Sequence, residues 1–182
     1  MDFNISDLKR ISKTTRLHHI QQTLNNYPIL REIYDEDFVN DLAEHPHSGN
    51  YLLWLLVSKN AYTALTWQSI CNNLEALRGC DSIMKFKNKL RASEETVFEN
   101  FLTELEFAGH YRVLGYGVEL EPVDGVDFSV KTIDLQILFQ VKHIYLRGEM
   151  KKKGIQDRLH ERLRRIKEPF IFTLEFVGRL EE

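Results

Sequence analysis

The first half of the chain carries apolar residues at helical spacing. One repeat starts at Ile5 and the next at Leu17, and in both the apolar positions lie three or four residues apart. The same spacing predicts four more helices, over residues 30–43, from 48 to about 56, around 67–77 and from 81 to about 90. Gly79 is expected to end the helix around 67–77. We therefore expect residues 1–90 to form a helical region.

From Ser93 the pattern changes. Ser93 is expected to cap a helix that Gly109 ends, because apolar residues between them fall on one stripe. Three strand-like runs then cover residues 111–121, 126–131 and 135–145. Only a few residues join the second and third runs, which favours an antiparallel hairpin.

An amphipathic helix over residues 155–166 and an apolar strand over 170–177 complete the predicted order of elements. A helix between two strands is long enough for a crossover, which favours a parallel pair. The predicted fold class is therefore α+β or α/β: a helical region over 1–90, and a domain over 91–182 with the order αβββαβ and a central mixed sheet.

Composition narrows the class of protein. Hydrophobic residues make up 43% of the 182 residues, enough for a globular core, and the net charge is −3. Cys71 and Cys80 are too few for a disulfide framework or a zinc site, and the first residues lack the pattern of a signal peptide. The longest apolar run, 52–57, is too short to cross a bilayer. We expect a soluble, cytoplasmic protein that does not enter membranes.

Polar residues interrupt two of the apolar strand runs. Side chains alternate along a strand, so Asp127 lies on the polar face of the run 126–131. Gln140 and Lys142 share the polar face of the next run. If the two strands pair with these faces aligned, the three side chains converge. Carboxylate and amide oxygens suit Mg²⁺ or Mn²⁺, and a neighbouring lysine can bind a phosphate.

These residues also form an ordered set of short motifs. In chain order they are Phe98-Glu99, Gly109, Gly125-Val126-Asp127 and Gln140-Val141-Lys142. In this order the segment resembles the PD-(D/E)XK nuclease superfamily, and within it is most similar to Mrr-type restriction endonucleases.

The resemblance implies a restriction-endonuclease-like core and a Mg²⁺- or Mn²⁺-dependent nuclease. Asp127 would be the principal metal ligand. Gln140 and the backbone carbonyl of Val141 would complete the ligand set, and Lys142 would be the catalytic lysine. Glu99 would reach the site from the helix, directly or through water. DNA is the expected substrate by analogy with the family.

The charge of the chain is concentrated in one stretch. Residues 142–167 hold ten Lys or Arg and three acidic residues, against a net charge of −3 for the whole chain. Six of the basic residues are candidates for contacts with the phosphates of nucleic acid: Lys151, Lys152, Lys153, Arg158, Arg162 and Arg165. A solvated helix face is the competing interpretation of the arginines.

Two other hypotheses stay open. The domain could have kept the nuclease fold without activity, as a module that binds nucleic acid or another protein. Alternatively, the strands could pair in another register in an unrelated α+β domain, which would place Asp127 far from Lys142. The oligomeric state is open too: nucleases that cut both strands often dimerise, which makes a homodimer one candidate.

Overall fold

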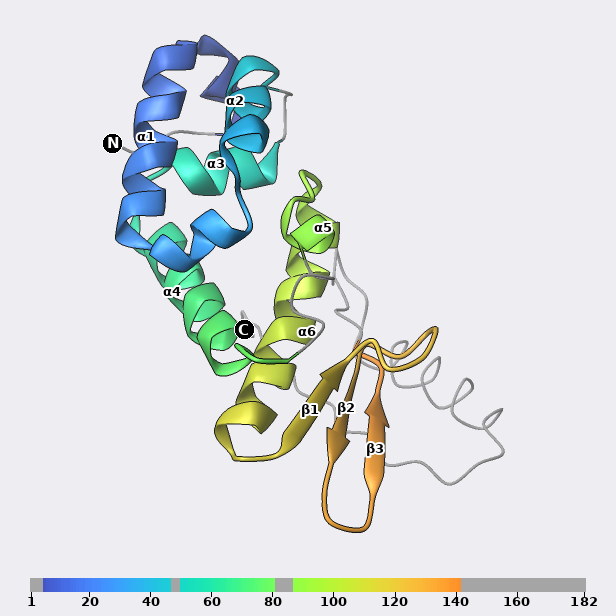
Figure 1. Ribbon diagram of the computed structural model, residues 1–182. Coiled ribbons are helices and arrows are strands. Elements are labelled where there is room, and N and C mark those ends of the chain that lie inside the picture. The colour runs from blue at the N-terminus through green and yellow to red at the C-terminus, as the bar shows by residue number, and fades with distance from the viewer. Residues whose placement is uncertain (1–4, 47–49, 81–86, 142–182) are drawn as a thin grey trace, which may run out of the picture. The chain divides into compact units, whose positions relative to one another are not determined.

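The computed structural model describes residues 5–46, 50–80 and 87–141 (Figure 1). All of them belong to one compact unit that spans residues 1–143. The predicted helix over 155–166 and strand over 170–177 lie outside the described residues. So do Lys142 and the six basic candidates for phosphate contacts. No helix in the described ranges has the length and apolar character needed to cross a membrane.

The described residues before 92 are helical, as their apolar spacing predicts. They contain two short 3₁₀ helices (η) and five α-helices, in this order: η1 (Ile5–Arg10), α1 (Lys13–Asn26), η2 (Pro28–Glu32), α2 (Glu36–Glu44), α3 (Tyr51–Val57), α4 (Ala61–Ala76) and α5 (Lys87–Leu90). Gly79 has a φ of 90° just beyond the end of α4, which fits the predicted stop.

The single helix predicted over 30–43 is wrong, because the segment contains two. Asp35 separates η2 from α2 with an extended backbone, at φ −69° and ψ 168°. Its carboxylate accepts a hydrogen bond of 3.0 Å from the backbone N–H of Phe38 and so caps α2. An acidic residue within an apolar repeat therefore starts a new helix.

The helix that begins the second half differs from its prediction at both ends. It is α6 (Glu95–Val113), with Glu94 at the N-cap position, and the carbonyl of Ser93 accepts a hydrogen bond from the N–H of Tyr51. It also continues past Gly109. A Cβ at that position would lie 2.1 Å from the Oδ1 atom of Asn73 in α4, so the glycine serves the close approach of two helices and does not end one.

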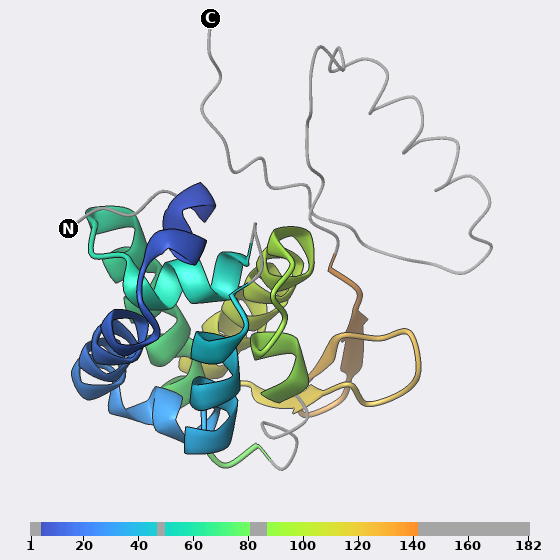
Figure 2. The same ribbon diagram turned by 90° about the horizontal axis from the view of Figure 1, so that it is seen from above.

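A three-stranded sheet follows α6 and packs against it (Figures 1 and 2). Its strands are β1 (Gly117–Leu120), β2 (Phe128–Lys131) and β3 (Gln136–Phe139), in the order β1-β2-β3 with both pairs antiparallel. The predicted hairpin is confirmed. Each strand is shorter than predicted, and residues 111–113 belong to α6 instead of a strand. The parallel strand expected in a mixed sheet lies outside the described residues.

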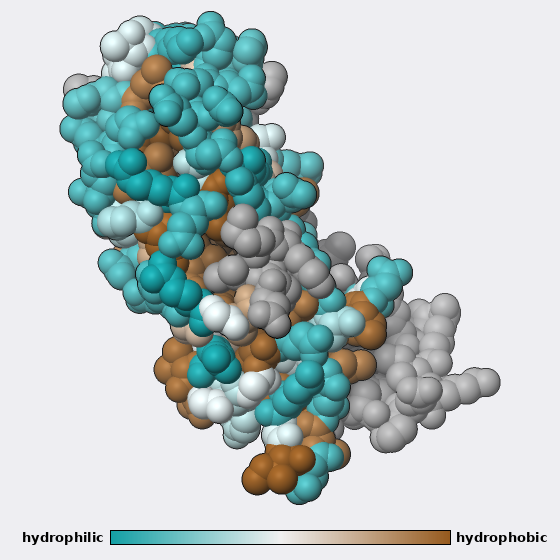
Figure 3. Space-filling view, in the orientation of Figure 1, coloured by the Kyte–Doolittle hydropathy of each residue, from teal (hydrophilic) through white to brown (hydrophobic). Residues whose placement is uncertain are grey.

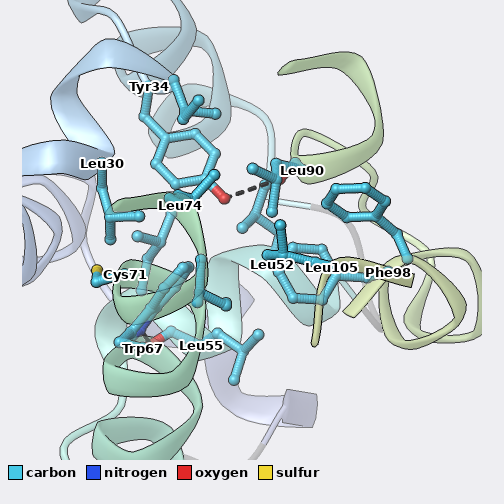
Figure 4. Packing of buried hydrophobic residues seen from close by; sticks show 14 of the residues in the cluster. Leu30, Tyr34, Leu52, Leu55, Trp67, Cys71, Leu74, Leu90, Phe98 and Leu105 are labelled. Atoms are coloured by element: carbon cyan, nitrogen blue, oxygen red, sulfur yellow. Dashed lines mark hydrogen bonds between the residues drawn. The ribbon is translucent and has the colours of Figure 1, made fainter. Parts of the chain in front are cut away.

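One hydrophobic core cluster includes buried side chains of the helices and of the sheet. Figure 4 shows part of this cluster among the helices. Trp67 is buried in α4 and donates its indole N–H to the carbonyl of Leu55, at 3.0 Å. The Tyr34 hydroxyl is also buried and donates to the carbonyl of Leu90, at 2.8 Å. Buried side chains of α6, such as Phe98, belong to the same cluster. The core therefore continues across residue 90, the boundary that the sequence suggested between two regions.

Candidate functional site

Three polar residues lie in one row beyond the same end of the sheet. The register pairs Leu120 of β1 with Phe128 of β2, and Phe128 with Phe139 of β3. The next residues in these strand directions are Glu121, Asp127 and Gln140. A short hairpin and antiparallel pairing are sufficient to bring them to one edge.

Hydrogen bonds hold Asp127 against the end of β3. Its backbone N–H donates to the carbonyl of Phe139 at 2.9 Å, and its Oδ2 atom accepts from the backbone N–H of Val141 at 2.6 Å. The side-chain amide of Gln140 donates to the carbonyl of Gly125 at 3.0 Å. The structure therefore brings together Asp127, Gln140 and Val141, three of the predicted site residues.

The donor atoms at this edge fit a hard cation. Asp127 is half-buried and supplies a carboxylate, while Gln140 is exposed and supplies an amide oxygen. The described residues contain no group of three His, Cys, Asp or Glu side chains close enough to share a metal ion. A cation held here would have one carboxylate ligand, and water or substrate oxygens would complete its coordination, as is usual for Mg²⁺.

Glu99 is bound elsewhere. Its Oε1 atom accepts hydrogen bonds from the hydroxyls of Tyr51 and Tyr62, at 3.0 and 3.3 Å, and these hydroxyls lie 2.7 Å apart. Burial, with the hydrogen bond to Tyr62, raises the pKa of the Tyr51 hydroxyl above its usual value.

The rotation of α6 explains the position of Glu99. Glu106, two turns along the helix, accepts a hydrogen bond from Ser69 of α4 at 2.8 Å, so the α4-facing stripe includes positions 99 and 106. Successive residues turn by about 100°. The sheet-facing stripe includes Tyr111, whose ring contacts Phe128 and Phe139. The structure does not bring Glu99 to Asp127.

An ion cluster that was not predicted from the sequence lies beside Asp127. Glu121 forms an ion pair of 2.9 Å with Lys89 of α5, and Lys89 forms a second of 2.8 Å with Glu104 of α6. Burial tends to lower the pKa of Lys89, but the hydrogen bonds that Lys89 donates to Glu104 and Glu121 outweigh it and raise that pKa. The position of Glu121 at the end of a strand was a visible signal. Its pairing with a lysine 32 residues earlier was not.

Comparison with family models, with curated proteins and with solved structures finds no match to this chain.

Proposed function

We propose that this protein is a metal-dependent nuclease that hydrolyses phosphodiester bonds, with DNA as its substrate. The observation that supports the proposal best is the contact between Asp127 and the Gln140–Val141 segment. The Asp127 carboxylate lies 2.6 Å from the backbone nitrogen of Val141, and Lys142 is the next residue in the chain. A carboxylate, an amide, a carbonyl and a lysine together would supply the chemistry that phosphodiester hydrolysis needs.

Each residue has a separate task in this proposal. Asp127, Gln140 and the carbonyl of Val141 would hold Mg²⁺ or Mn²⁺, which when bound lowers the pKa of a water molecule and stabilises negative charge on the phosphate. Lys142 would bind and orient the scissile phosphate. The basic residues of the stretch 151–165 would bind neighbouring phosphates of the nucleic acid.

The single carboxylate has a consequence for metal binding. Asp127 is the one charged oxygen ligand in the proposed set, so the affinity for Mg²⁺ in the absence of nucleic acid should be low. Oxygens of the substrate phosphate would complete the coordination. The proposed site should therefore bind metal and nucleic acid cooperatively.

The test is cleavage of plasmid DNA, single-stranded DNA and RNA with Mg²⁺ or Mn²⁺. Asp127→Asn and Lys142→Ala are expected to lower the rate by about a hundredfold or more, because each removes a charge at the reacting phosphate. Asp124→Asn is the matched control: Asp124 is exposed in the turn just before Asp127 and is not part of the proposed ligand set. Cleavage that survives in both site variants would contradict the assignment.

A module that binds nucleic acid without cutting it is the second candidate, favoured by the single carboxylate. It predicts that the wild-type protein binds DNA and slows its migration in a mobility-shift assay, and that no divalent metal produces cleavage. It also predicts that Asp127→Asn binds DNA as tightly as the wild type does. Arg158→Glu with Arg162→Glu would then weaken binding, and raising the salt concentration would have the same effect.

A further inference from the structure

Glu121 has a backbone conformation that is rare for a residue with a side chain. Among residues 5–46, 50–80 and 87–141 it is the one position other than glycine with a positive φ, at 48°. The Cβ atom disfavours this region of backbone space, and the following Pro122 restricts Glu121 further. Such conformations persist where surrounding interactions hold them. The partners of Glu121 therefore show what fixes the end of β1.

An ion cluster holds the side chain of Glu121. The Lys89 ammonium group lies between the carboxylates of Glu121 and Glu104, at 2.9 and 2.8 Å, and 5.6 Å from the centre of the Phe101 ring. The side chains of Glu104, Lys89 and Glu121 are 14%, 31% and 34% exposed. Solvent and salt screen partly buried pairs less than they screen surface pairs. The cluster thus joins the end of β1 to α5 and α6.

The backbone of Glu121 extends this connection to the candidate site. Its N–H donates a hydrogen bond of 2.9 Å to the carbonyl of Asp127. On its other side, Asp127 is bound to Phe139 and Val141 of the β3 end. Asp127 is therefore fixed between two strand ends, and the first of these is held by Lys89 and Glu104.

We propose that Glu121, held by Lys89 and Glu104, is a positioning residue that fixes the Asp127 carboxylate against the Val141 amide. The inference rests on the proposed function, in which that carboxylate holds the metal. Glu121 acts through the backbone of Asp127 and does not need to touch substrate.

The test follows the Val141 amide by NMR, because this N–H donates to the Asp127 carboxylate. Its chemical shift reports whether the hydrogen bond to the carboxylate is formed, and its hydrogen exchange reports how firmly the bond is held. Glu121→Gln and Lys89→Met are expected to lower the exchange protection of Val141 by about tenfold, because the Asp127 carboxylate would then be held less firmly against this amide. Lys89→Arg keeps the positive charge, so Val141 is expected to keep most of the exchange protection that it loses in Lys89→Met.

A second ion pair on the same strand supplies the control. Glu119 pairs with Lys131 at 2.7 Å across β1 and β2, away from the Glu121–Asp127 row. Glu119→Gln therefore removes an ion pair from β1 and should leave the Val141 amide unchanged. The amide of Val130, in the middle strand, monitors the stability of the whole sheet in every variant.

The outcomes are distinct. Loss of protection at Val141 but not at Val130, with recovery in Lys89→Arg, would support the proposal. It would be overturned by unchanged protection in Glu121→Gln. Equal loss at Val141 and Val130 would also overturn it, because the cluster would then stabilise the sheet without positioning Asp127. If Lys89→Met does not fold, Glu121→Gln carries the test.

These measurements use neither metal nor nucleic acid, so their result does not depend on nuclease activity. If the protein cuts no nucleic acid but the Val141 amide responds as expected, the proposed function would be wrong and the positioning role of Glu121 would stand. If cleavage needs Asp127 but the Val141 amide does not respond in Glu121→Gln, the proposed function would stand and the positioning role of Glu121 would be overturned.

Discussion

At the scale of single residues, Gly109 is the position where one added methyl group should matter most. In an open helix, Gly→Ala stabilises by about 1 kcal/mol. Here the added carbon would lie 2.1 Å from Oδ1 and 2.9 Å from Cβ of Asn73. Overpacking of this kind typically costs about 1–3 kcal/mol, so the clash should outweigh the gain in helix propensity. We expect Gly109→Ala to lower the free energy of unfolding by up to about 2 kcal/mol, measured by urea denaturation.

A double variant identifies the cause of this loss. Asn73→Ala removes the two closest atoms but also the hydrogen bond of 2.9 Å from Asn73 to the carbonyl of Ser69. Its own effect must therefore be measured separately. If the clash is the cause, Gly109→Ala combined with Asn73→Ala will be more stable than the sum of the two single effects. A Gly109→Ala protein more stable than the wild type would contradict the close approach of α4 and α6.

At the scale of elements, Asp35 joins α2 to α5. Its Oδ2 atom is paired with Lys87 at 2.9 Å and with Arg91, while its Oδ1 atom caps α2. The hydrogen bond from Lys87, followed by that from the Phe38 N–H, lowers the pKa of the Asp35 carboxyl well below its usual value. Because the folded-state pKa is depressed, the stabilisation is complete above the unfolded pKa, about 3.9, and is lost as pH falls toward the folded-state pKa.

Asp35→Asn separates the contribution of the ion pairs to stability from that of the helix cap, because asparagine caps helices as well as aspartate does. The variant is expected to be less stable than the wild type at pH 7, and the difference should shrink as the pH falls below about 4. Urea denaturation from pH 7 to pH 2.5 measures both effects. Asp37→Asn, an exposed change in the first turn of the same helix, is the control. A difference that stays constant over this range would mean that Asp35 has an ordinary pKa.

Periodicity predicted the helices and the hairpin because it reports which face of an element is buried. Alternation and a short connection were also sufficient to place Asp127 beside Gln140. Two of the errors, at Gly109 and Glu99, arose where a neighbour distant in sequence decides the outcome. Gly109 looks like a helix stop until Asn73 is known to pack against it. Glu99 could be placed on a helix, but the direction it faces depends on how α6 rotates against α4 and the sheet.

At the scale of the whole described unit, exposed apolar side chains gather on the β2–β3 hairpin. Figure 3 shows a group of apolar side chains at the lower end of the view, where Figure 1 places the β2–β3 hairpin. Of the eleven large apolar residues that are exposed in the described ranges, eight lie between the end of α6 and the end of β3, and four of these belong to the β2–β3 hairpin: Ile133, Leu135, Ile137 and Leu138. The other four are Val113, Leu114, Tyr116 and Val123. Such a concentration is typical of a surface that contacts another molecule.

Within this surface, β3 is the part that we expect to drive self-association. Among the described strands it lies at the sheet edge, and Ile137 and Leu138 are 46% and 53% exposed on its two faces. Edge strands without charged residues pair readily with other chains, and a lysine on the edge suppresses this. We expect Leu138→Lys to reduce self-association at high concentration, measured by sedimentation velocity, with a change in stability within about 0.5 kcal/mol.

Val130→Lys supplies the contrast, because Val130 is buried in the middle strand β2 and is 2% exposed. A lysine there must bury an unpaired charge, so this variant should unfold. If Leu138→Lys also unfolds the protein, Leu138 is covered in the folded chain and the edge of β3 is not available to a partner. If it folds and associates as strongly as the wild type, the apolar surface of the sheet does not drive association. If Leu138→Lys folds but associates less than the wild type, β3 is the surface through which the chains contact one another, and the oligomeric state depends on this strand.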